Sequence, residues 1–294
     1  MKFLLIGDIH ARSKTPHARR DNIQEVLADK FSQVGELALK HGVTAVITTG
    51  DLFDKARVSN ETLLFTSELI NKLPVQLITA VGNHDMIGNS NENYKLTSLH
   101  ILEKITENLV LIPVTGVRFE NVVISGNNYG NNNFILTGQK VKGVKDILVT
   151  HSMITESATM FDSISVQDVK TNYDFIITGH NHSKFLYKNI YNPGALLRLT
   201  AGKEDRKRII EVGLISIEKE IKLERILLKI NPEEEVFDLE QIIKKEKILD
   251  AAMIDKLNSV ISKISTVQDV FNLVLKNKDY NKDAIELLKK YVDI

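Results

Sequence analysis

The chain of 294 residues contains no cysteine and no tryptophan. Without cysteine, disulfide bonds and thiolate metal sites are excluded. An excess of one charge is also missing, because Lys plus Arg and Asp plus Glu number 38 each. A balanced total neither indicates nor excludes a nucleic-acid partner, since such binding depends on a local basic patch.

Long apolar runs are missing too. None approaches the roughly 20 residues of a membrane-spanning helix, and the apolar N-terminal stretch ends at Gly7, too early for a signal peptide. The chain has no internal repeat and no coiled-coil heptad array. We therefore expect a soluble, cytoplasmic protein without a membrane partner. The length suits one large domain with a small appendage.

Five short apolar runs each stop at a residue type that binds metal ions. They begin at Phe3, Ala45, Val75, Ile147 and Phe175. Such runs, rich in β-branched residues and bounded by polar segments, predict buried strands. In an open α/β sheet, ligands collect beyond the carboxyl ends of the strands. We therefore expect one crevice to collect seven candidate metal ligands, which are Asp8, His10, Asp51, Asn83, His151, His180 and His182.

Helical periodicity separates the first three of these runs. It predicts helices over residues 21–40 and 59–72, the second with Ser59 as N-cap, and a further helix over 89–108. This βαβαβ order is typical of a sheet with helices on its faces. Alternating apolar residues over 208–230 predict a hairpin that completes the core.

The pattern turns helical after Pro232, where Asp238 and Gln241 resemble a capping box. We therefore divide the chain into a catalytic domain, residues 1–230, and a helical C-terminal region, residues 231–294. The apolar stripes of this region can either cover the domain's own core or bind a partner.

The seven candidate ligands suit a pair of divalent ions. Imidazole and carboxylate groups bind Mn²⁺, Fe²⁺ and Zn²⁺, and Asp51 is the best candidate to bridge two ions. Two ions about 3.5–4 Å apart can clamp a phosphoryl group and activate a water as hydroxide. Two divalent ions carry four positive charges, and Asp8 and Asp51, the only carboxylates in the set, neutralise two of them. A hydroxide and a phosphodiester, with one negative charge each, offset the other two. A monoester is not excluded by this count.

His84 and Asp85 directly follow Asn83. We expect His84 to meet the substrate phosphate, where it stabilises the transition state or protonates the leaving oxygen. We expect Asp85 to orient His84 through a hydrogen bond. Both residues are therefore candidate catalytic residues.

Five segments look like the five blocks of the calcineurin-like metallophosphoesterases, in the same order and at compatible separations. They are Asp8–His10, Gly50–Asp54, Gly82–Asp85, Thr150–His151 and Gly179–His182. The resemblance implies a four-layer α/β/β/α sandwich, and it gives His84 the place of the catalytic histidine. It assigns the first metal ion to Asp8, His10, Asp51 and His182. It assigns the second to Asp51, Asn83, His151 and His180.

The segments 50–54 and 191–196 further resemble the SbcD-type DNA repair nucleases. That resemblance implies a Mn²⁺-dependent DNA exonuclease or endonuclease that acts as a homodimer with a coiled-coil ATPase of the SbcC type. The region after the core is shorter than in full-length relatives, which disfavours a separate DNA-capping domain. One alternative is a phosphodiesterase or phosphatase for nucleotides or phosphoproteins. Another is a binding subunit in which hydrolysis is secondary.

Four further residues are candidate substrate contacts: Arg12, His17, Tyr129 and Asn192. Each has a second interpretation. Arg12 and His17 can belong to a solvated loop, and Tyr129 and Asn192 can serve only the turns in which they lie.

Overall fold

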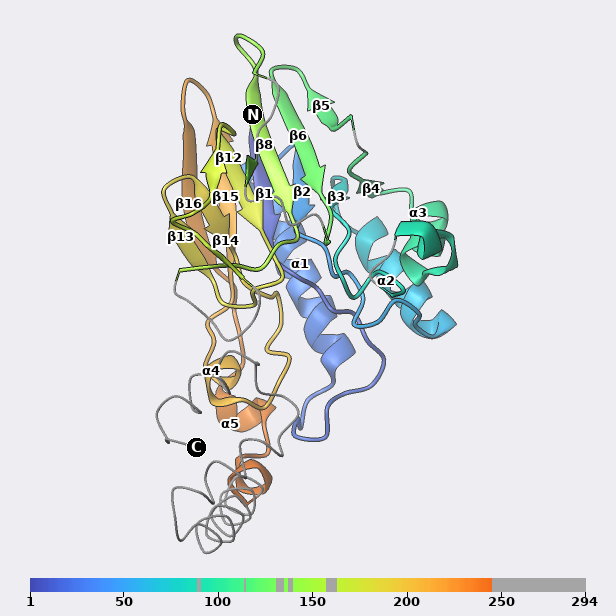
Figure 1. Ribbon diagram of the computed structural model, residues 1–294. Helices are drawn as coiled ribbons and strands as arrows, with labels where there is room; N and C mark the ends of the chain where they lie inside the picture. Colours follow the sequence, from blue (N-terminus) through green and yellow to red (C-terminus); the bar gives the residue numbers. More distant parts are fainter. Residues whose placement is uncertain (89–90, 114, 131–134, 137–139, 157–162, 245–294) are drawn as a thin grey trace, which may run out of the picture. The chain divides into compact units, whose positions relative to one another are not determined.

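The computed structural model describes residues 1–88, 91–113, 115–130, 135–136, 140–156 and 163–244 (Figure 1). Met1–Phe237 forms one compact unit, and Asp238–Ile294 forms a second. Within the second unit, the amide of Gln241 donates to Asp238 Oδ1 at 3.1 Å, which is the N-cap hydrogen bond of the predicted capping box. The apolar stripes predicted further along the tail lie outside the described residues.

The first sheet has six strands in the order β16-β15-β1-β2-β3-β4. Strands β1 to β4 run parallel, and the hairpin of β15 and β16 joins antiparallel beside β1. The hairpin predicted over 208–230 is therefore confirmed. The strand bounds are β1 Lys2–Ile6, β2 Ala45–Thr48, β3 Leu77–Thr79, β4 Leu109–Leu111, β15 Glu211–Ile217 and β16 Ile221–Leu227.

The second sheet also has six strands, in the order β13-β14-β12-β8-β6-β5. Strands β6, β8, β12 and β14 run parallel, and β5 and β13 are the antiparallel edges. Their bounds are β5 Val117–Phe119, β6 Val122–Asn127, β8 Lys145–Thr150, β12 Phe175–Thr178, β13 Phe185–Tyr187 and β14 Ile190–Asn192. Two short pairs complete the strands: β7 Ile135–Leu136 with β11 Lys170–Thr171, and β9 Ile154–Thr155 with β10 Ile164–Ser165.

Helices α1 (Ile23–His41) and α2 (Asn60–Asn71) confirm the first two predicted helices. Ser59 caps α2 as expected, because its side chain accepts from the amide of Thr62. The single helix predicted over 89–108 is wrong. The chain forms a 3-10 helix, η1 (Asn91–Leu96), and then α3 (Ser98–Ile105), because Thr97 leaves helical geometry and caps α3. Two one-turn helices follow, α4 (Lys203–Arg206) and α5 (Glu233–Val236).

Three apolar clusters separate the layers of the main unit. One lies between α1, α2, α3 and the first sheet. The second lies between the sheets, where Leu5 and Ile47 face Val149 and Ile177. The third covers the outer face of the second sheet, where Ile176 packs in the cluster that contains β9 and β10. In the residues that the structure describes, this last layer consists of short strands and turns.

The predicted α/β sandwich is confirmed, with two facing mixed sheets. Its parallel strands direct the carboxyl ends of β1, β2 and β3, and those of β8 and β12, to one edge. None of the described helices has the length and apolar content that a bilayer span requires.

Candidate metal centre

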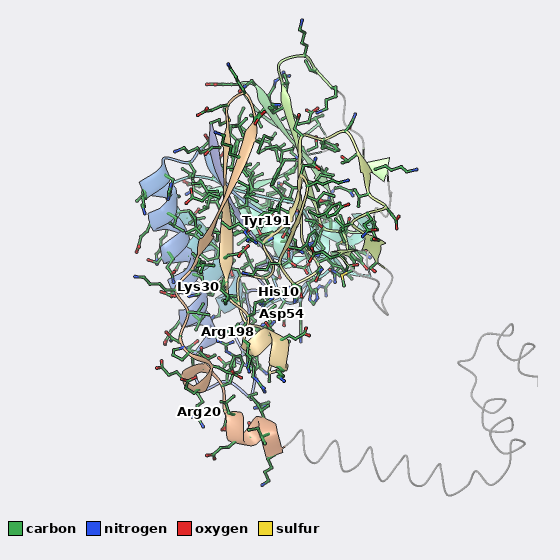
Figure 2. All side chains as sticks on the ribbon, turned by 90° about the vertical axis from the view of Figure 1, so that its left-hand side faces the viewer. His10, Arg20, Lys30, Asp54, Tyr191 and Arg198 are labelled. Carbon is green, nitrogen blue, oxygen red and sulfur yellow. The ribbon has the colours of Figure 1, made fainter. Side chains whose placement is uncertain are left out.

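The strand ends of the two sheets are joined by hydrogen bonds at one edge of the sandwich. The amide of His180, after β12, donates to Asp8 Oδ2, after β1, at 2.9 Å. The Nδ1 of His151, after β8, lies 3.0 Å from the carbonyl of Thr49, after β2. His10 lies at this end of the molecule, whereas Tyr191 lies in the core between the sheets (Figure 2). The folding of five separate segments therefore creates the site.

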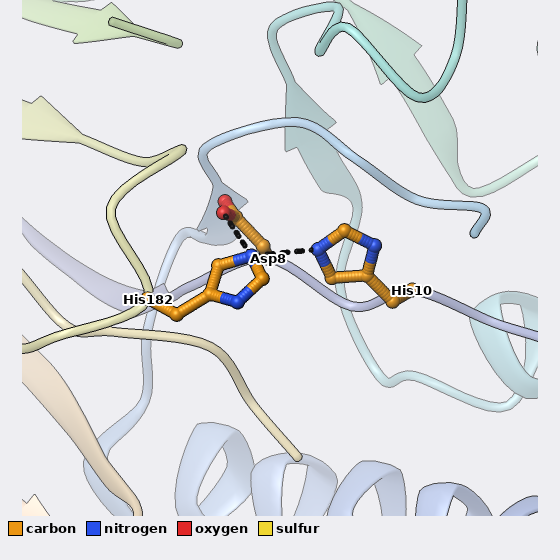
Figure 3. A group of neighbouring side chains, drawn as sticks. All are labelled: Asp8, His10 and His182. Carbon is orange, nitrogen blue, oxygen red and sulfur yellow. Dashed lines mark hydrogen bonds and ion pairs between the residues drawn. The ribbon is translucent and has the colours of Figure 1, made fainter. Parts of the chain in front are cut away.

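A first group of ligand atoms comes from Asp8, His10 and His182 (Figure 3). The Nε2 atoms of His10 and His182 lie 3.0 Å apart. His182 Nε2 lies 3.8 Å from Asp8 Oδ2, and His10 Nε2 lies 3.7 Å from Asp51 Oδ2. These are the four residues that the resemblance assigns to the first metal ion.

A second group comes from Asp51, His151 and His180. The Nε2 of His151 lies 3.2 Å from Asp51 Oδ2 and 3.0 Å from Asn83 Oδ1. Asp51 therefore lies between the two groups, in the place of a bridging carboxylate. The structure thus brings together all seven candidate ligands predicted from the sequence.

The second group fits a cation on chemical grounds. His151 Nδ1 faces a carbonyl, which only accepts, so Nδ1 carries a proton and the neutral ring keeps a lone pair on Nε2. That lone pair faces two further acceptors, Asp51 Oδ2 and Asn83 Oδ1. Asp51 Oδ2 is buried and makes no hydrogen bond within the described part of the chain. Three converging acceptors require a positive charge between them, either a proton or a metal ion.

Three of the candidate ligands also have strained backbone conformations. His10, Asp51 and His180 have φ angles of 51°, 46° and 70°, in the left-handed region that residues with a side chain seldom adopt. Such conformations persist where surrounding structure enforces them, and they cluster at functional sites. Here the amides of Ile9 and His10 both donate to the Asp51 carbonyl, at 3.1 and 2.8 Å, which fixes two of these turns together.

Burial keeps most of the site histidines neutral. It lowers the pKa of His10 well below the ordinary range and lowers that of His182. It also lowers the pKa of His180 to about 4, with help from the neighbouring His151. A neutral imidazole is the form that binds a metal ion.

The carboxylates make His151 the exception. Burial alone lowers its pKa, but the charges of Asp51 and Asp8 outweigh burial and raise the pKa to about 9. In return, His151 and His10 hold the pKa of Asp51 below its usual value, although burial acts in the opposite direction. Asp8 behaves differently, because burial raises its pKa. A bound metal ion would replace the proton that His151 carries.

The prediction that Asp85 orients His84 through a hydrogen bond is wrong. The Asp85 carboxylate is buried and accepts the amides of Leu52, Phe53 and Gly82 at 3.1–3.3 Å. These hydrogen bonds link the turn at Asp51 to the turn at Gly82, so Asp85 stabilises the backbone of the site. The His84 ring instead bonds through Nδ1 to the backbone carbonyl of Asp54 at 2.7 Å. Its side chain nevertheless lies at the centre, because its ring centroid is 4.8 Å from that of His10.

Asp54 also holds a candidate substrate contact in place. Its carboxylate forms an ion pair of 2.6 Å with Arg12, whose side chain is 21% exposed. Asp54 thus connects Arg12 and His84, one through its side chain and the other through its carbonyl. Carbonyl groups leave no trace in a sequence pattern, so sequence reasoning missed this role.

The structure places the other three candidate substrate contacts in different environments. The Tyr129 ring lies beside the site, with centroids 5.3 Å from His180 and 6.2 Å from His151. His17 is exposed and makes no hydrogen bond or ion pair with the described residues of the site. Asn192 is 1% exposed, and its side chain bonds to Asn181 and Gly194. The structure therefore contradicts a substrate contact by Asn192, whose polar atoms shape a turn.

The fold and the paired ligand groups define a class of phosphoesterase. The chain belongs to the calcineurin-like phosphoesterase family, whose sequence model matches residues 1–184. The predicted family is confirmed.

Two of the similar proteins are named as DNA repair proteins, and a third is named as an exonuclease subunit. The DNA double-strand break repair protein Mre11 of Sulfolobus acidocaldarius is 26% identical over 229 residues, which are 72% of this chain and 56% of that protein. Mre11 of Sulfurisphaera tokodaii is 24% identical over 227 residues, with the same coverage. Exonuclease subunit 1 of Enterobacteria phage T4 is 31% identical over 128 residues, 42% of this chain and 37% of that protein. The matched regions thus span about half of these relatives or less.

Proposed function

We propose that this chain is a metal-dependent DNA nuclease that hydrolyses phosphodiester bonds. The observation that carries the proposal is the pair of ligand groups with Asp51 between them, at the strand ends of a phosphoesterase fold. DNA as the substrate is supported by the relatives, two of which are named for double-strand break repair and one as an exonuclease subunit.

The donor set favours divalent ions of the first transition series. Imidazole, carboxylate and amide oxygen ligands suit Mn²⁺, Fe²⁺ and Zn²⁺ alike. We propose Mn²⁺ because the sequence resembles the SbcD-type nucleases. When bound, a pair of such ions polarises a phosphoryl oxygen and lowers the pKa of an attacking water.

The surrounding residues then position and neutralise the DNA phosphate. Because the Nδ1–H of His84 donates to the Asp54 carbonyl, Nε2 is left to face the phosphate. In the imidazolium form, Nε2 carries a second proton, which it donates to the leaving oxygen, and the ring then remains as the neutral Nδ1–H tautomer. The Arg12 guanidinium, anchored through Nη2 by Asp54, keeps further N–H donors that can hydrogen-bond to a neighbouring phosphate. The Tyr129 ring offers a face on which a base at the site can stack.

We also propose that the chain works with a partner subunit. The phage relative is named as a subunit of an exonuclease, which supports this proposal. The resemblance to SbcD-type nucleases suggests an SbcC-type ATPase as the partner and a homodimer as the assembly. In this proposal the C-terminal region that the sequence predicts to be helical, residues 231–294, is the element that binds the partner.

The test is hydrolysis of end-labelled duplex DNA by the purified chain with Mn²⁺, beside a generic aryl phosphodiester. We expect DNA cleavage that stops when a chelator is added. The matched variant is His84→Gln, which should bind Mn²⁺ as the wild type does and cleave DNA about 10²–10⁴-fold more slowly, the usual contribution of a positioned acid or base.

Two results would contradict the proposal. Hydrolysis of the aryl diester without any cleavage of DNA would assign the site to small substrates. Wild-type turnover by His84→Gln would remove His84 from the chemistry while leaving the metal centre in place.

A further inference from the structure

His182 is held differently from His10, the other histidine of the first group. Its side chain is 38% exposed, whereas that of His10 is 2% exposed. Packing therefore restrains the His182 imidazole much less. The His182 backbone compensates, because its carbonyl accepts two hydrogen bonds, from the amide of Ala195 at 3.3 Å and from Nη1 of Arg208 at 2.6 Å.

Arg208 reaches this carbonyl from the segment between α4 and β15. Its side chain is 11% exposed, and its Nη2 donates to the carbonyl of Leu197. The guanidinium is planar and its donors form a rigid fork, so one group that bonds to two carbonyls fixes their separation. Arg208 thus ties the His182 loop to the segment 195–198.

That segment is itself attached to another candidate ligand. The amide of Leu196 donates to the Asp8 carbonyl at 2.8 Å. Two residues further on, Arg198 (labelled in Figure 2) donates from its side chain to the carbonyls of Arg206 and Asn231 at 2.9 and 2.5 Å. Arg208 therefore acts on a segment that is fixed at both ends, and it connects the backbones that carry Asp8 and His182.

The positive charge of Arg208 is balanced by a neighbouring carboxylate. Asp205 forms an ion pair with Nη2 at 2.5 Å. A bare guanidinium beside a metal site would repel a divalent cation, whereas a paired one contributes hydrogen bonds with little net field. This pairing suits a group that holds a ligand loop.

We propose that Arg208 is a positioning residue for the first metal ion. By bridging the His182 and Leu197 carbonyls, it holds the His182 imidazole at the separation from Asp8 and His10 that one shared cation requires. The inference rests on the proposed metal centre and adds to it a residue from outside the five family segments. Arg208 touches neither substrate nor metal and acts only through His182.

The test is Mn²⁺ binding, followed by the electron paramagnetic resonance signals of free, single and paired Mn²⁺. The variants are Arg208→Gln and Arg208→Lys, and His182→Ala marks the loss of the first ion. The matched control is Lys207→Gln, which removes the same charge from the exposed neighbour. Each protein is also melted without metal to measure its stability.

We expect Arg208→Gln to bind one Mn²⁺ as the wild type does and the other about 10–100-fold more weakly, the usual effect of losing a group that orients a metal ligand. The paired signal should then give way to a single-ion signal, as in His182→Ala. Arg208→Lys should keep the defect, because a lysine cannot bridge two carbonyls as a fork does. Lys207→Gln should resemble the wild type.

Each contrary result has its own meaning. A wild-type chain that binds no pair of ions would overturn the metal centre and this inference together. A wild-type pair with unchanged binding in Arg208→Gln would overturn only the role of Arg208. If both Mn²⁺ ions bound more weakly to the same degree and the melting temperature fell, Arg208 would stabilise the whole fold. That result would also overturn a role specific to His182.

Discussion

At the scale of single residues, the site depends on a mismatch between acceptors and donors. Two acceptor atoms, Asp51 Oδ2 and Asn83 Oδ1, lie 3.2 and 3.0 Å from the Nε2 of His151. Without metal, a proton on His151 relieves this mismatch, because the carboxylates raise its pKa to about 9 against the opposing effect of burial. The same position can therefore hold a proton or a metal ion, and the two compete.

This competition predicts proton release on metal binding. At pH 7 the metal-free His151 is protonated, because pH 7 lies below its pKa of about 9. A metal ion at Nε2 must displace that proton, so Mn²⁺ binding should release about one proton and tighten by up to about tenfold per pH unit from pH 7 to 9. Calorimetric titration in two buffers of different ionisation heat measures the release. A binding heat that is the same in both buffers would argue against it.

The candidate ligands that the sequence predicts and the structure brings together share one property: their chemistry is carried by the side chain. The sequence indicates Asp8, His10 and Asp51 as candidate ligands by their residue type and by their position after an apolar run. The partner of His84 could not be found in this way, because it is the carbonyl of Asp54. Asn192 was misassigned for a related reason, since its sequence position does not show that Asn181 and Gly194 use its polar atoms.

At the scale of elements, local signals predicted boundaries wherever a cap or breaker stands alone. Ser59 and Pro74 bracket α2, and Gly42 ends α1 in the left-handed conformation. The region 89–108 is also predicted to be one helix, but Thr97 divides it into η1 and α3. Pairing between distant strands, such as β1 with β15, has no local signal and had to come from the structure.

The contact that brings β1 to the site is a close approach of two backbones. A Cβ on Gly7 would lie 1.5 Å from the carbonyl oxygen of Gly194. Gly7→Ala should therefore separate the end of β1 from the segment after Gly194, and lower the free energy of unfolding by roughly 1–3 kcal/mol or more. Urea denaturation measures this change.

The matched control is Gly35→Ala within α1. There a Cβ would meet Pro74 at an ordinary 3.7 Å, and alanine favours a helix interior over glycine, so stability should stay or rise. If both variants were equally stable, the contact between Gly7 and Gly194 would not constrain this edge.

At the scale of the whole molecule, the candidate ligands join two sheets. Asp8 and Asp51 follow strands of the first sheet, whereas His151 and His180 follow strands of the second. The sheets otherwise meet through the apolar cluster between them and through hydrogen bonds at this edge. A metal pair would therefore cross-link the sandwich at its functional edge, so that catalytic assembly and global stability depend on the same ligands.

Metal binding should accordingly stabilise the main unit. At a free Mn²⁺ concentration one hundred times the dissociation constant, one site contributes about 2.7 kcal/mol, which corresponds to roughly 5–10 °C in melting temperature for a domain of this size. Thermal melts with Mn²⁺ and with a chelator measure the difference. Because Asp51 Oδ2 lies between the two ligand groups, 3.7 Å from His10 Nε2 and 3.2 Å from His151 Nε2, Asp51→Asn should lose most of the Mn²⁺-dependent shift while Lys207→Gln keeps it. A wild-type melting temperature that does not respond to Mn²⁺ would show that no ion joins the two sheets.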